Sequence, residues 1–209
     1  VYKRQVNLLR AGPVDVHYQG ASFRFYHQAS ATERGALFNP DYNIEELDFL
    51  RAHTPTGGVF VDVGTNVGTY ALALARHVGA GGKVIAIEPH PVTHARLAFN
   101  NAASGYSQTR LVATAAGPID GKLMIETDGD NLGASHIVSG QASSKAIKVP
   151  SLRLQRILAE AGVSHVDALK IDVEGFEDRV LTGFFKEAPQ ALWPRAVVIE
   201  HLSSNEWQN

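Results

Sequence analysis

The order of the predicted strands and helices constrains the fold of this chain more than any other feature. From residue 57 onward, short and mainly apolar segments alternate with segments of helical periodicity. The expected strands are Val59–Val63, Lys83–Ile87, Arg110–Ala115, Val166–Ile171 and Ala196–Ile199, and helices are expected at about 67–78, 91–103, 151–161 and 174–186. Strands that are mainly apolar are buried on both faces, and right-handed crossovers between them place helices on both sides of a sheet. The pattern predicts an α/β fold with a doubly wound, mostly parallel sheet.

Two further segments predict β-hairpins outside this alternation. Residues 14–26 alternate apolar and polar side chains around Gly20, which predicts a hairpin near the N-terminus. Lys122–Glu126 and Ala146–Val149 flank a polar segment rich in Gly and Ser. This second pair predicts an inserted hairpin with a long loop before the fourth core strand.

The chain before residue 57 is predicted to extend the core. Residues 27–42 have no clear periodicity and predict irregular structure, and Asn43 is a candidate cap for a helix through about His53. We expect a single domain over residues 1–209, with an extension at 1–56 and a ligand-binding core at 57–201.

Composition and charge exclude several classes of protein. The net charge is −2, and no basic run is longer than Lys3-Arg4, so nothing favours a nucleic-acid partner. There is no cysteine, which excludes disulfides and thiolate metal sites and is compatible with the cytoplasmic location that we predict. No apolar stretch reaches the roughly 20 residues of a membrane span. The oligomeric state is left open by the sequence.

The carboxyl ends of the predicted strands are where such sheets bind ligands. The polar residues at these ends are Asp62, Glu88, Asp172 and Glu200. After the first strand, Gly64-Thr65-Asn66-Val67-Gly68 resembles a dinucleotide-binding turn, but Asn66 occupies the position of its second glycine and Thr69 that of its third. That second glycine lets the backbone contact a pyrophosphate. We therefore expect a smaller ligand without phosphates, with a tight turn that binds nothing as the alternative.

Glu88 follows Gly64 by 24 residues and ends the second predicted strand. A carboxylate at this position can accept hydrogen bonds from both hydroxyls of an adenosine ribose, and it would repel a 2′-phosphate. A solvated acid at a strand end would explain Glu88 alone. The combination with the glycine turn favours ligand binding.

The segment "LKIDVEGFED", Leu169 to Asp178, carries the third group of polar residues. Acids in the first turn of a helix are favoured by the helix dipole, which is a sufficient explanation for Glu177 and an alternative for Glu174. Asp172 differs because it ends a buried strand beside the predicted ligand crevice. Gly175 allows a ligand or another backbone segment to approach closely.

Three motifs carry a family resemblance: "VDVGTNVGTYAL", "VIAIEP" and "LKIDVEGFE", with weaker support from "NLGASH" and "VPSLRLQRIL". With these motifs the sequence resembles the FkbM-type family of S-adenosylmethionine-dependent methyltransferases, which have a Rossmann-like fold. The resemblance covers roughly residues 43–201. Two final strands typical of class I methyltransferases are not recognisable after Glu200-His201.

The resemblance implies S-adenosylmethionine as the cofactor and assigns residues to it. The implied cofactor-binding residues are Asp62, Gly64, Asn66 and Gly68 at the methionine end, Glu88 at the ribose, Ala115 and Ala116 beside the adenine, and Asp172. Asp172 and Glu174 would face the methyl-transfer pocket. The implied acceptor is an oxygen nucleophile on a small molecule or a saccharide.

A hydroxyl acceptor would gain from a general base, and the candidates are Asp172, Glu174, His136 and His201. No metal site is predicted, because His90 and His94 lack a third ligand, although paired carboxylates such as Asp172 and Glu174 could hold a divalent cation. Two other classes stay open. One is an NAD(P)-dependent oxidoreductase, and the other is a non-catalytic module that binds S-adenosylmethionine.

Overall fold

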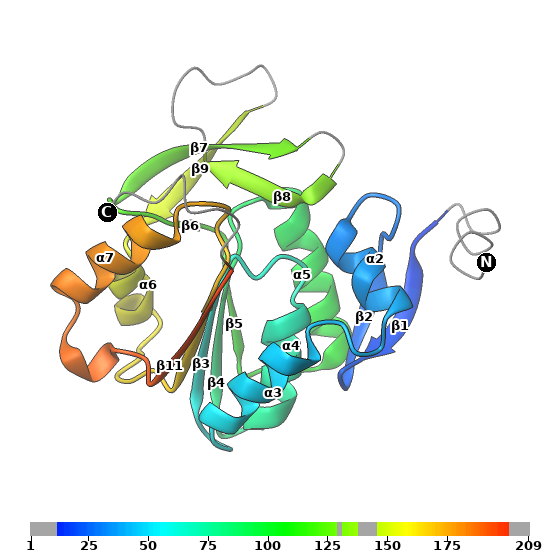
Figure 1. The fold of residues 1–209 in the computed structure, drawn as a ribbon, viewed down its shortest axis with the longest axis horizontal. Coiled ribbons are helices and arrows are strands. Elements are labelled where there is room, and N and C mark those ends of the chain that lie inside the picture. The colour runs from blue at the N-terminus through cyan, green and yellow to red at the C-terminus, as the bar shows by residue number, and fades with distance from the viewer. Residues whose placement is uncertain (1–11, 129–130, 138–145, 201–209) are drawn as a thin grey trace.

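A five-stranded parallel sheet forms the centre of the molecule in the computed structural model, which describes residues 12–128, 131–137 and 146–200 (Figure 1). Its strand order is β11-β10-β3-β4-β5. The strands are β3 (Val59–Val63), β4 (Lys83–Ile87), β5 (Thr109–Val112), β10 (Ala168–Ile171) and β11 (Ala196–Ile199). The predicted doubly wound, mostly parallel sheet is therefore confirmed.

The order of the strands reverses between β3 and β10. Strand β3 pairs with β4 on one side, and the chain then continues outward to β5. On its other side β3 pairs with β10, which the chain reaches only after a long excursion. This reversal is the topological switch point, and ligands in open α/β sheets bind at the carboxyl ends of the strands that border it.

Helices cover both faces of the sheet because successive residues of each strand point to opposite sides. Val61 and Val63 pack with the helices α6 (Leu154–Glu160) and α7 (Glu177–Glu187), while Phe60 packs on the opposite side. That opposite layer consists of α3 (Ile44–His53), α4 (Thr69–Val78) and α5 (Pro91–Ser104), with Pro91 in the first turn of α5 as predicted. A short 3₁₀ helix, η1 (Gln190–Leu192), precedes β11.

The predicted N-terminal hairpin is present and packs outside α4 and α5. It consists of β1 (Val14–Tyr18) and β2 (Ala21–Phe25), with Tyr18 opposite Ala21 across the turn. Its apolar face joins Phe23 and Phe25 to Leu72 of α4. The hairpin therefore enlarges the core on one side of the molecule rather than forming a separate unit.

The prediction of irregular structure at 27–42 is wrong in part, because the helix α2 (Ala31–Phe38) lies within it. Ser30 caps this helix by accepting a hydrogen bond from the Glu33 backbone amide. The Glu33 carboxylate is fully buried, and it accepts hydrogen bonds from the Tyr26 backbone amide and from Arg96 of α5. A helix this short depends on such tertiary contacts, which its own apolar pattern does not reveal.

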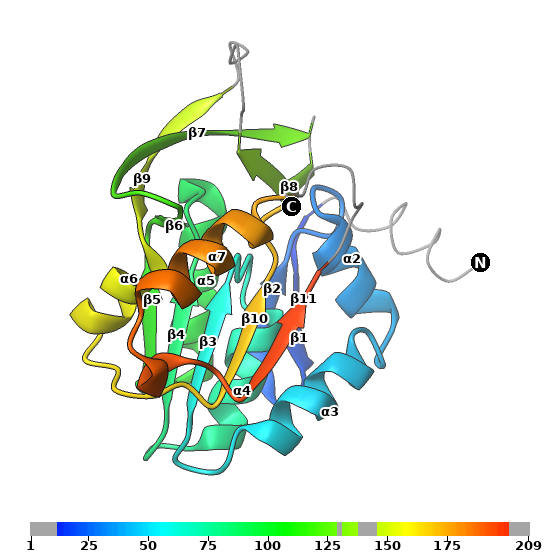
Figure 2. The same ribbon diagram turned by 60° about the vertical axis from the view of Figure 1, so that its left-hand side comes forward.

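The inserted segment forms a second, four-stranded sheet of order β6-β9-β7-β8. The strands are β6 (Ala115–Ala116), β7 (Gly121–Asp128), β8 (Asn131–Ile137) and β9 (Ile147–Leu152). The predicted pairing of residues 122–126 with 146–149 is present, with Leu123 opposite Val149, but strand β8 on the other edge of β7 was not predicted. This sheet stands over one end of the central sheet (Figures 1 and 2).

Two predicted helix starts are corrected by the structure. Ser151, the predicted start of a helix, lies in β9, and α6 begins at Leu154. The predicted bounds of α3 are confirmed, although Asn43 precedes it in a left-handed conformation without a side-chain capping bond. Glu174 and Gly175 have positive φ angles of 51° and 96°, so α7 begins only at Glu177. The loop between β10 and α7 is therefore longer than expected, and it lies at the switch point.

Candidate active site

The ends of β3 and β10 meet at Gly64 and Asp172. The Gly64 amide donates to the Ile87 carbonyl oxygen at 3.0 Å, and its φ angle is +75°. A Cβ atom on Gly64 would lie 1.7 Å from the Asp172 carbonyl oxygen. Only glycine therefore allows the two strand ends to come this close. Two hollows open on either side of this junction, and we call them the cleft and the chamber.

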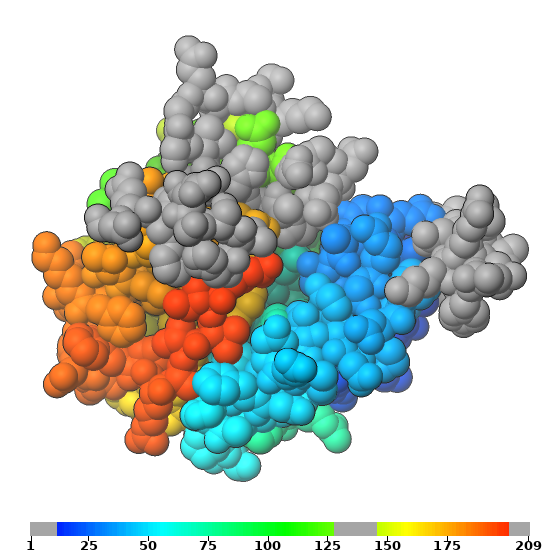
Figure 3. All heavy atoms as spheres, in the orientation of Figure 1, coloured from blue at the N-terminus to red at the C-terminus, as the bar shows by residue number. Residues whose placement is uncertain are grey.

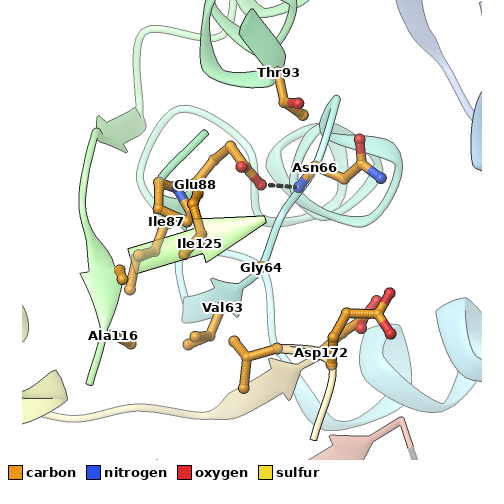
Figure 4. Close-up of a pocket in the computed structure, with 13 residues that line it drawn as sticks. Val63, Gly64, Asn66, Ile87, Glu88, Thr93, Ala116, Ile125 and Asp172 are labelled. Carbon is orange, nitrogen blue, oxygen red and sulfur yellow. Dashed lines mark hydrogen bonds between the residues drawn. The ribbon is translucent and has the colours of Figure 1, made fainter. Parts of the chain in front are cut away.

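The cleft is lined mainly by apolar side chains (Figure 4). Val63, Ile87 and Ala116 come from the central strands and β6, and Ile125 of β7 closes the cleft from the inserted sheet. Ala115 also belongs to the lining. The enclosed volume is about 50 Å³, so a nucleoside must also occupy the open mouth of the cleft.

Glu88 supplies the carboxylate of the cleft and is only 6% exposed. Its Oε2 accepts a hydrogen bond from the Asn66 backbone amide at 3.0 Å (Figure 4), and its Oε1 accepts one from the His90 amide at 2.9 Å. Burial raises the pKa of Glu88 to about 7, although the two amides act in the opposite direction. Each oxygen retains a second lone pair, so this carboxylate can accept hydrogen bonds from two further donors.

Asn66 has a φ angle of +53°, a conformation that Asn adopts more readily than most residues. Its backbone amide is the group that a dinucleotide turn would direct at a pyrophosphate, and here it donates to Glu88. The Asn66 side-chain nitrogen lies 3.4 Å from Thr32 Oγ1 of α2. A phosphate site would need the backbone amide at this position to donate to the phosphate. Here the Asn66 amide donates to the Glu88 carboxylate instead.

Two residues implied in cofactor binding lie beneath the turn, outside the linings of both hollows. Asp62 is fully buried, and its Oδ2 accepts a hydrogen bond from Thr65 Oγ1 at 2.6 Å. Burial raises its pKa above the ordinary value. Gly68 is the N-cap residue of α4, and a Cβ there would lie 2.7 Å from Leu97 Cδ1. Both residues hold the turn from below.

The chamber has a volume of about 290 Å³ and lies on the β10–β11 side of the junction. Lys170 and Asp172 of its lining form an ion pair, with 2.9 Å between Nζ and Oδ2, and the Lys170 ammonium lies 4.9 Å from the centre of the Tyr70 ring. Burial acts to raise the pKa of Asp172, but the Lys170 ammonium and the hydrogen bond with Glu200 together outweigh burial and leave that pKa below its ordinary value. Asp172 is thereby held as a carboxylate.

Glu200 stands beside Asp172 because β10 and β11 are adjacent parallel strands. The Glu200 amide donates to the Ile171 carbonyl oxygen at 3.1 Å, and the two side-chain carboxyl groups share a hydrogen bond. This hydrogen bond, together with burial and the charge of Asp172, raises the pKa of Glu200 to about 7. In the sequence, Glu200 is among the polar strand ends where ligands bind, but no role could be assigned to it, since the partner that shifts its pKa comes from another strand.

The opposite wall of the chamber comes from the segment before the core. It includes Thr32 of α2, Tyr42 and Asn43, and Glu46 of α3. Figure 3 shows α3, in cyan, beside β11, in red, on one face of the molecule. Sequence reasoning missed this wall because no motif marks it.

The remaining predicted site residues have different placements. Glu174 borders both the cleft and the chamber. His136 lies in β8, opposite Glu126 in the register of β7, and its side chain is outside the described residues, as is all of His201.

Within the described residues, no group of three or more His, Asp or Glu side chains could hold a metal ion. No helix of the described part of the chain is long and apolar enough to cross a bilayer.

The site as a whole fits a nucleoside without a pyrophosphate. The apolar lining suits a purine, the Glu88 carboxylate suits two ribose hydroxyls, and the carboxylates at the junction suit a sulfonium cation. These features, on a sheet of this topology, fit a binding site for S-adenosylmethionine. The model of the methyltransferase FkbM domain matches residues 62–208. The chain therefore belongs to the FkbM methyltransferase family, and its cofactor is S-adenosylmethionine.

Solved structures with a similar fold include methyltransferases of several kinds. A Clostridium thermocellum protein described as an rRNA methylase is 12% identical over 78% of this chain and 70% of its own, with a TM-score of 0.50. TYW2 of M. jannaschii in complex with AdoMet is 19% identical over 49% of this chain and 43% of its own, with a TM-score of 0.41. An O-methyltransferase of Thermotoga maritima is 14% identical over 78% of this chain and 45% of its own, with a TM-score of 0.46.

The chain thus spans less than half the length of two of these three proteins, and at these identities the likeness concerns the fold alone. No curated protein matches the chain by sequence.

Proposed function

We propose that this protein is an O-methyltransferase that transfers the methyl group of S-adenosylmethionine to a hydroxyl of a small molecule or a saccharide. The observation that carries this proposal is the junction at Gly64 and Asp172. Both residues line the apolar cleft and also the polar chamber, so a donor in one hollow and an acceptor in the other would meet there.

In this proposal, different residues of the cleft bind different parts of the cofactor. Glu88 accepts hydrogen bonds from the two ribose hydroxyls, and Ala115, Ala116 and Ile125 enclose the adenine. Gly64 and Asn66 border the methionine end, while Asp62 and Gly68 keep the turn in shape from beneath. The Asn66 amide fixes the Glu88 carboxylate at 3.0 Å, so the ribose acceptor is oriented before the ligand arrives.

The protein contributes to methyl transfer mainly by alignment and by electrostatics. S-adenosylmethionine supplies, when bound, an electrophilic methyl group on a positively charged sulfur. Asp172 and Glu174 border the junction and attract positive charge there. Ideal alignment of two reacting groups accounts for about 7–11 kcal/mol of a reaction barrier. Asp172, held as a carboxylate by Lys170, is the fixed negative charge at the point of transfer.

The NAD(P)-dependent alternative is disfavoured by Asn66. Its backbone amide is engaged by Glu88, so it is not directed at the pyrophosphate of a dinucleotide. A non-catalytic module has no specific observation in its favour, because the chamber beside the cleft would then have no purpose. The cytoplasmic location stays a prediction.

Two measurements test the proposal. The first is calorimetric titration of the protein with S-adenosylhomocysteine and, in parallel, with NAD and NADP. We expect binding of S-adenosylhomocysteine alone. The second is S-adenosylhomocysteine release from S-adenosylmethionine with a panel of hydroxyl acceptors and matched amines. Binding without release on any hydroxyl compound would favour the non-catalytic module, and release on amines alone would contradict O-methylation.

A further inference from the structure

The chamber is built by several parts of the chain that are distant in sequence. Tyr42 and Glu46 come from the segment before the core, and Tyr70 comes from α4. Lys170 belongs to β10, and Glu200 follows β11. The chamber shares four lining residues with the cleft, namely Gly64, Asn66, Asp172 and Glu174. A ligand in the chamber would therefore lie next to the group that is transferred.

The charges of the chamber select the chemistry of such a ligand. Its lining holds four carboxyl groups, from Glu46, Asp172, Glu174 and Glu200, and one ammonium group, from Lys170. That ammonium is buried and paired with Asp172 at 2.9 Å. Ionised carboxylates only accept hydrogen bonds, so they favour a ligand that brings donors, and the excess of negative charge disfavours an anion. Hydroxyl groups without phosphate or carboxylate groups meet both conditions.

The size of the chamber and its aromatic residues limit the class of ligand further. Tyr42 and Tyr70 both belong to the lining, and Tyr70 is only 9% exposed, with the Lys170 ammonium 4.9 Å from the centre of its ring. The surrounding acceptors suit a small ligand with several hydroxyl groups. A saccharide has this composition, and the volume of about 290 Å³ is near the lower end of typical ligand pockets, which begin at roughly 300 Å³.

Two carboxyl groups of the chamber could receive a proton, and their surroundings differ. Asp172 is paired with Lys170, which stabilises its charged form and makes it a weak base. Glu200 forms no ion pair like that of Asp172 with Lys170, and the groups that interact with its charge are Asp172, Lys170, Glu174, Tyr42 and Tyr70. The hydrogen bond that a protonated Glu200 donates to the Asp172 carboxylate raises the proton affinity of Glu200, so Glu200 is the better proton acceptor at neutral pH.

We propose that the chamber is the acceptor site for an uncharged saccharide, and that the Glu200 carboxylate receives the proton of the hydroxyl that is methylated. In this step the hydroxyl oxygen forms the new carbon–oxygen bond while the carbon–sulfur bond breaks. The bonding pair stays on sulfur, and the proton passes from the hydroxyl to Glu200. This inference rests on the proposed O-methyltransferase function and names its acceptor class and its base.

The charge selection is tested by binding rather than by turnover. The protein is saturated with S-adenosylhomocysteine, and three probes are compared by ligand-observed NMR: methyl glucoside, glucuronate and glucose 6-phosphate. We expect methyl glucoside to bind at least tenfold more tightly than either anion. Equal or tighter binding of an anion overturns the proposal, and so does the absence of binding by all three probes. Failure of S-adenosylhomocysteine itself to bind would instead contradict the proposed function.

The role of Glu200 is tested with Glu200→Gln and the matched surface variant Glu45→Gln. In carboxyl-labelled protein, ¹³C NMR should show a glutamate that titrates near pH 7 and is absent from Glu200→Gln, with Glu88→Gln used to assign the other such signal. With an acceptor in hand, we expect turnover to fall by about 100-fold or more in Glu200→Gln and to lose its rise with pH near 7. Affinity for S-adenosylhomocysteine should stay within about threefold. An unchanged pH profile in Glu200→Gln would overturn the assignment of the base.

Discussion

The cleft and the chamber share one wall, yet they are constructed in opposite ways. In the cleft, the Glu88 carboxylate is fixed by two backbone amides and the remaining surface is apolar. In the chamber, the polar groups are side chains from several elements, and they are fixed mainly by one another, as Lys170 and Asp172 are. A binding site whose polar groups are fixed by the backbone suits a ligand that is the same in all related proteins. A binding site formed by side chains can acquire a different ligand specificity through point substitutions.

The largest expected effect is the loss of stability in Gly64→Ala, which changes a residue in the wall that the cleft and the chamber share. The new Cβ would lie 1.7 Å from the Asp172 carbonyl oxygen at a φ of +75°. We expect a loss of about 4 kcal/mol of stability, from roughly 1–3 kcal/mol of backbone strain and a similar cost of overpacking. Thermal unfolding measures it. Gly57→Ala is the matched control, since Gly57 has a φ of +81° and open space, and it should cost only about 1–2 kcal/mol. Similar losses in the two variants would contradict the role of close approach.

Glu88→Ala should weaken ligand binding in the cleft and leave the lining of the chamber unchanged. Two ribose hydroxyls lose a charged acceptor, and hydrogen bonds to charged groups contribute about 1.5–3 kcal/mol each. We expect the affinity for S-adenosylhomocysteine to fall by about 100-fold or more in calorimetry. Circular dichroism verifies the fold, because the Asn66 and His90 amides also lose their partner. The exposed Glu45→Ala serves as control. Unchanged affinity in Glu88→Ala would remove the main support for the cleft as the cofactor site.

Asp172→Asn probes a residue that belongs to both hollows. Asparagine keeps the shape of the side chain but loses the charge that pairs with Lys170. We expect turnover to fall by about 100-fold, within the range typical for catalytic groups, while the affinity for S-adenosylhomocysteine changes by less than about threefold. Asp48→Asn on the surface of α3 is the control. If binding and turnover decrease equally, Asp172 belongs to cofactor binding alone.

The smallest expected effect is the pH dependence of the affinity for S-adenosylhomocysteine, which arises from Glu88 in the cleft. Ribose hydroxyls donate to the deprotonated form of Glu88, whose pKa burial raises to about 7. The affinity for S-adenosylhomocysteine should therefore be constant above pH 7 and fall by up to about tenfold per unit as the pH decreases below 7. Calorimetry between pH 5.5 and 8, at roughly half-unit steps, measures this slope. In Glu88→Gln the slope should vanish, and a persistent slope would assign the titration to another group.

The central sheet could be predicted from the sequence because its signals are local. Strands β3, β4 and β11 have the predicted bounds, since each is a short apolar run with a turn signal at its end. The resemblance to FkbM-type methyltransferases rested on the loops that follow β3 and β10. In the structure those loops meet at Gly64 and Asp172.

The chamber could not be predicted, for physical reasons. Helix α2 is held by Glu33, whose partners Tyr26 and Arg96 lie elsewhere in the chain, so no local pattern marks it. The character of Glu200 depends on Asp172 of the neighbouring strand. The positive φ of Glu174 delays the start of α7 to Glu177, which a helical pattern of apolar residues does not reveal. Each of these features depends on tertiary contacts.

The segment that carries Thr32, Tyr42 and Glu46 borders the chamber and has no residue in the lining of the cleft. With the chamber as the proposed acceptor site, substitutions in this segment would change the acceptor while the lining of the cleft, where the methyl donor is proposed to bind, keeps the same residues. A graft of residues 31–46 from a related chain would then be expected to transfer acceptor preference as a unit. The part of this protein with the weakest sequence signature would thus be the part through which one core can be adapted to different acceptors.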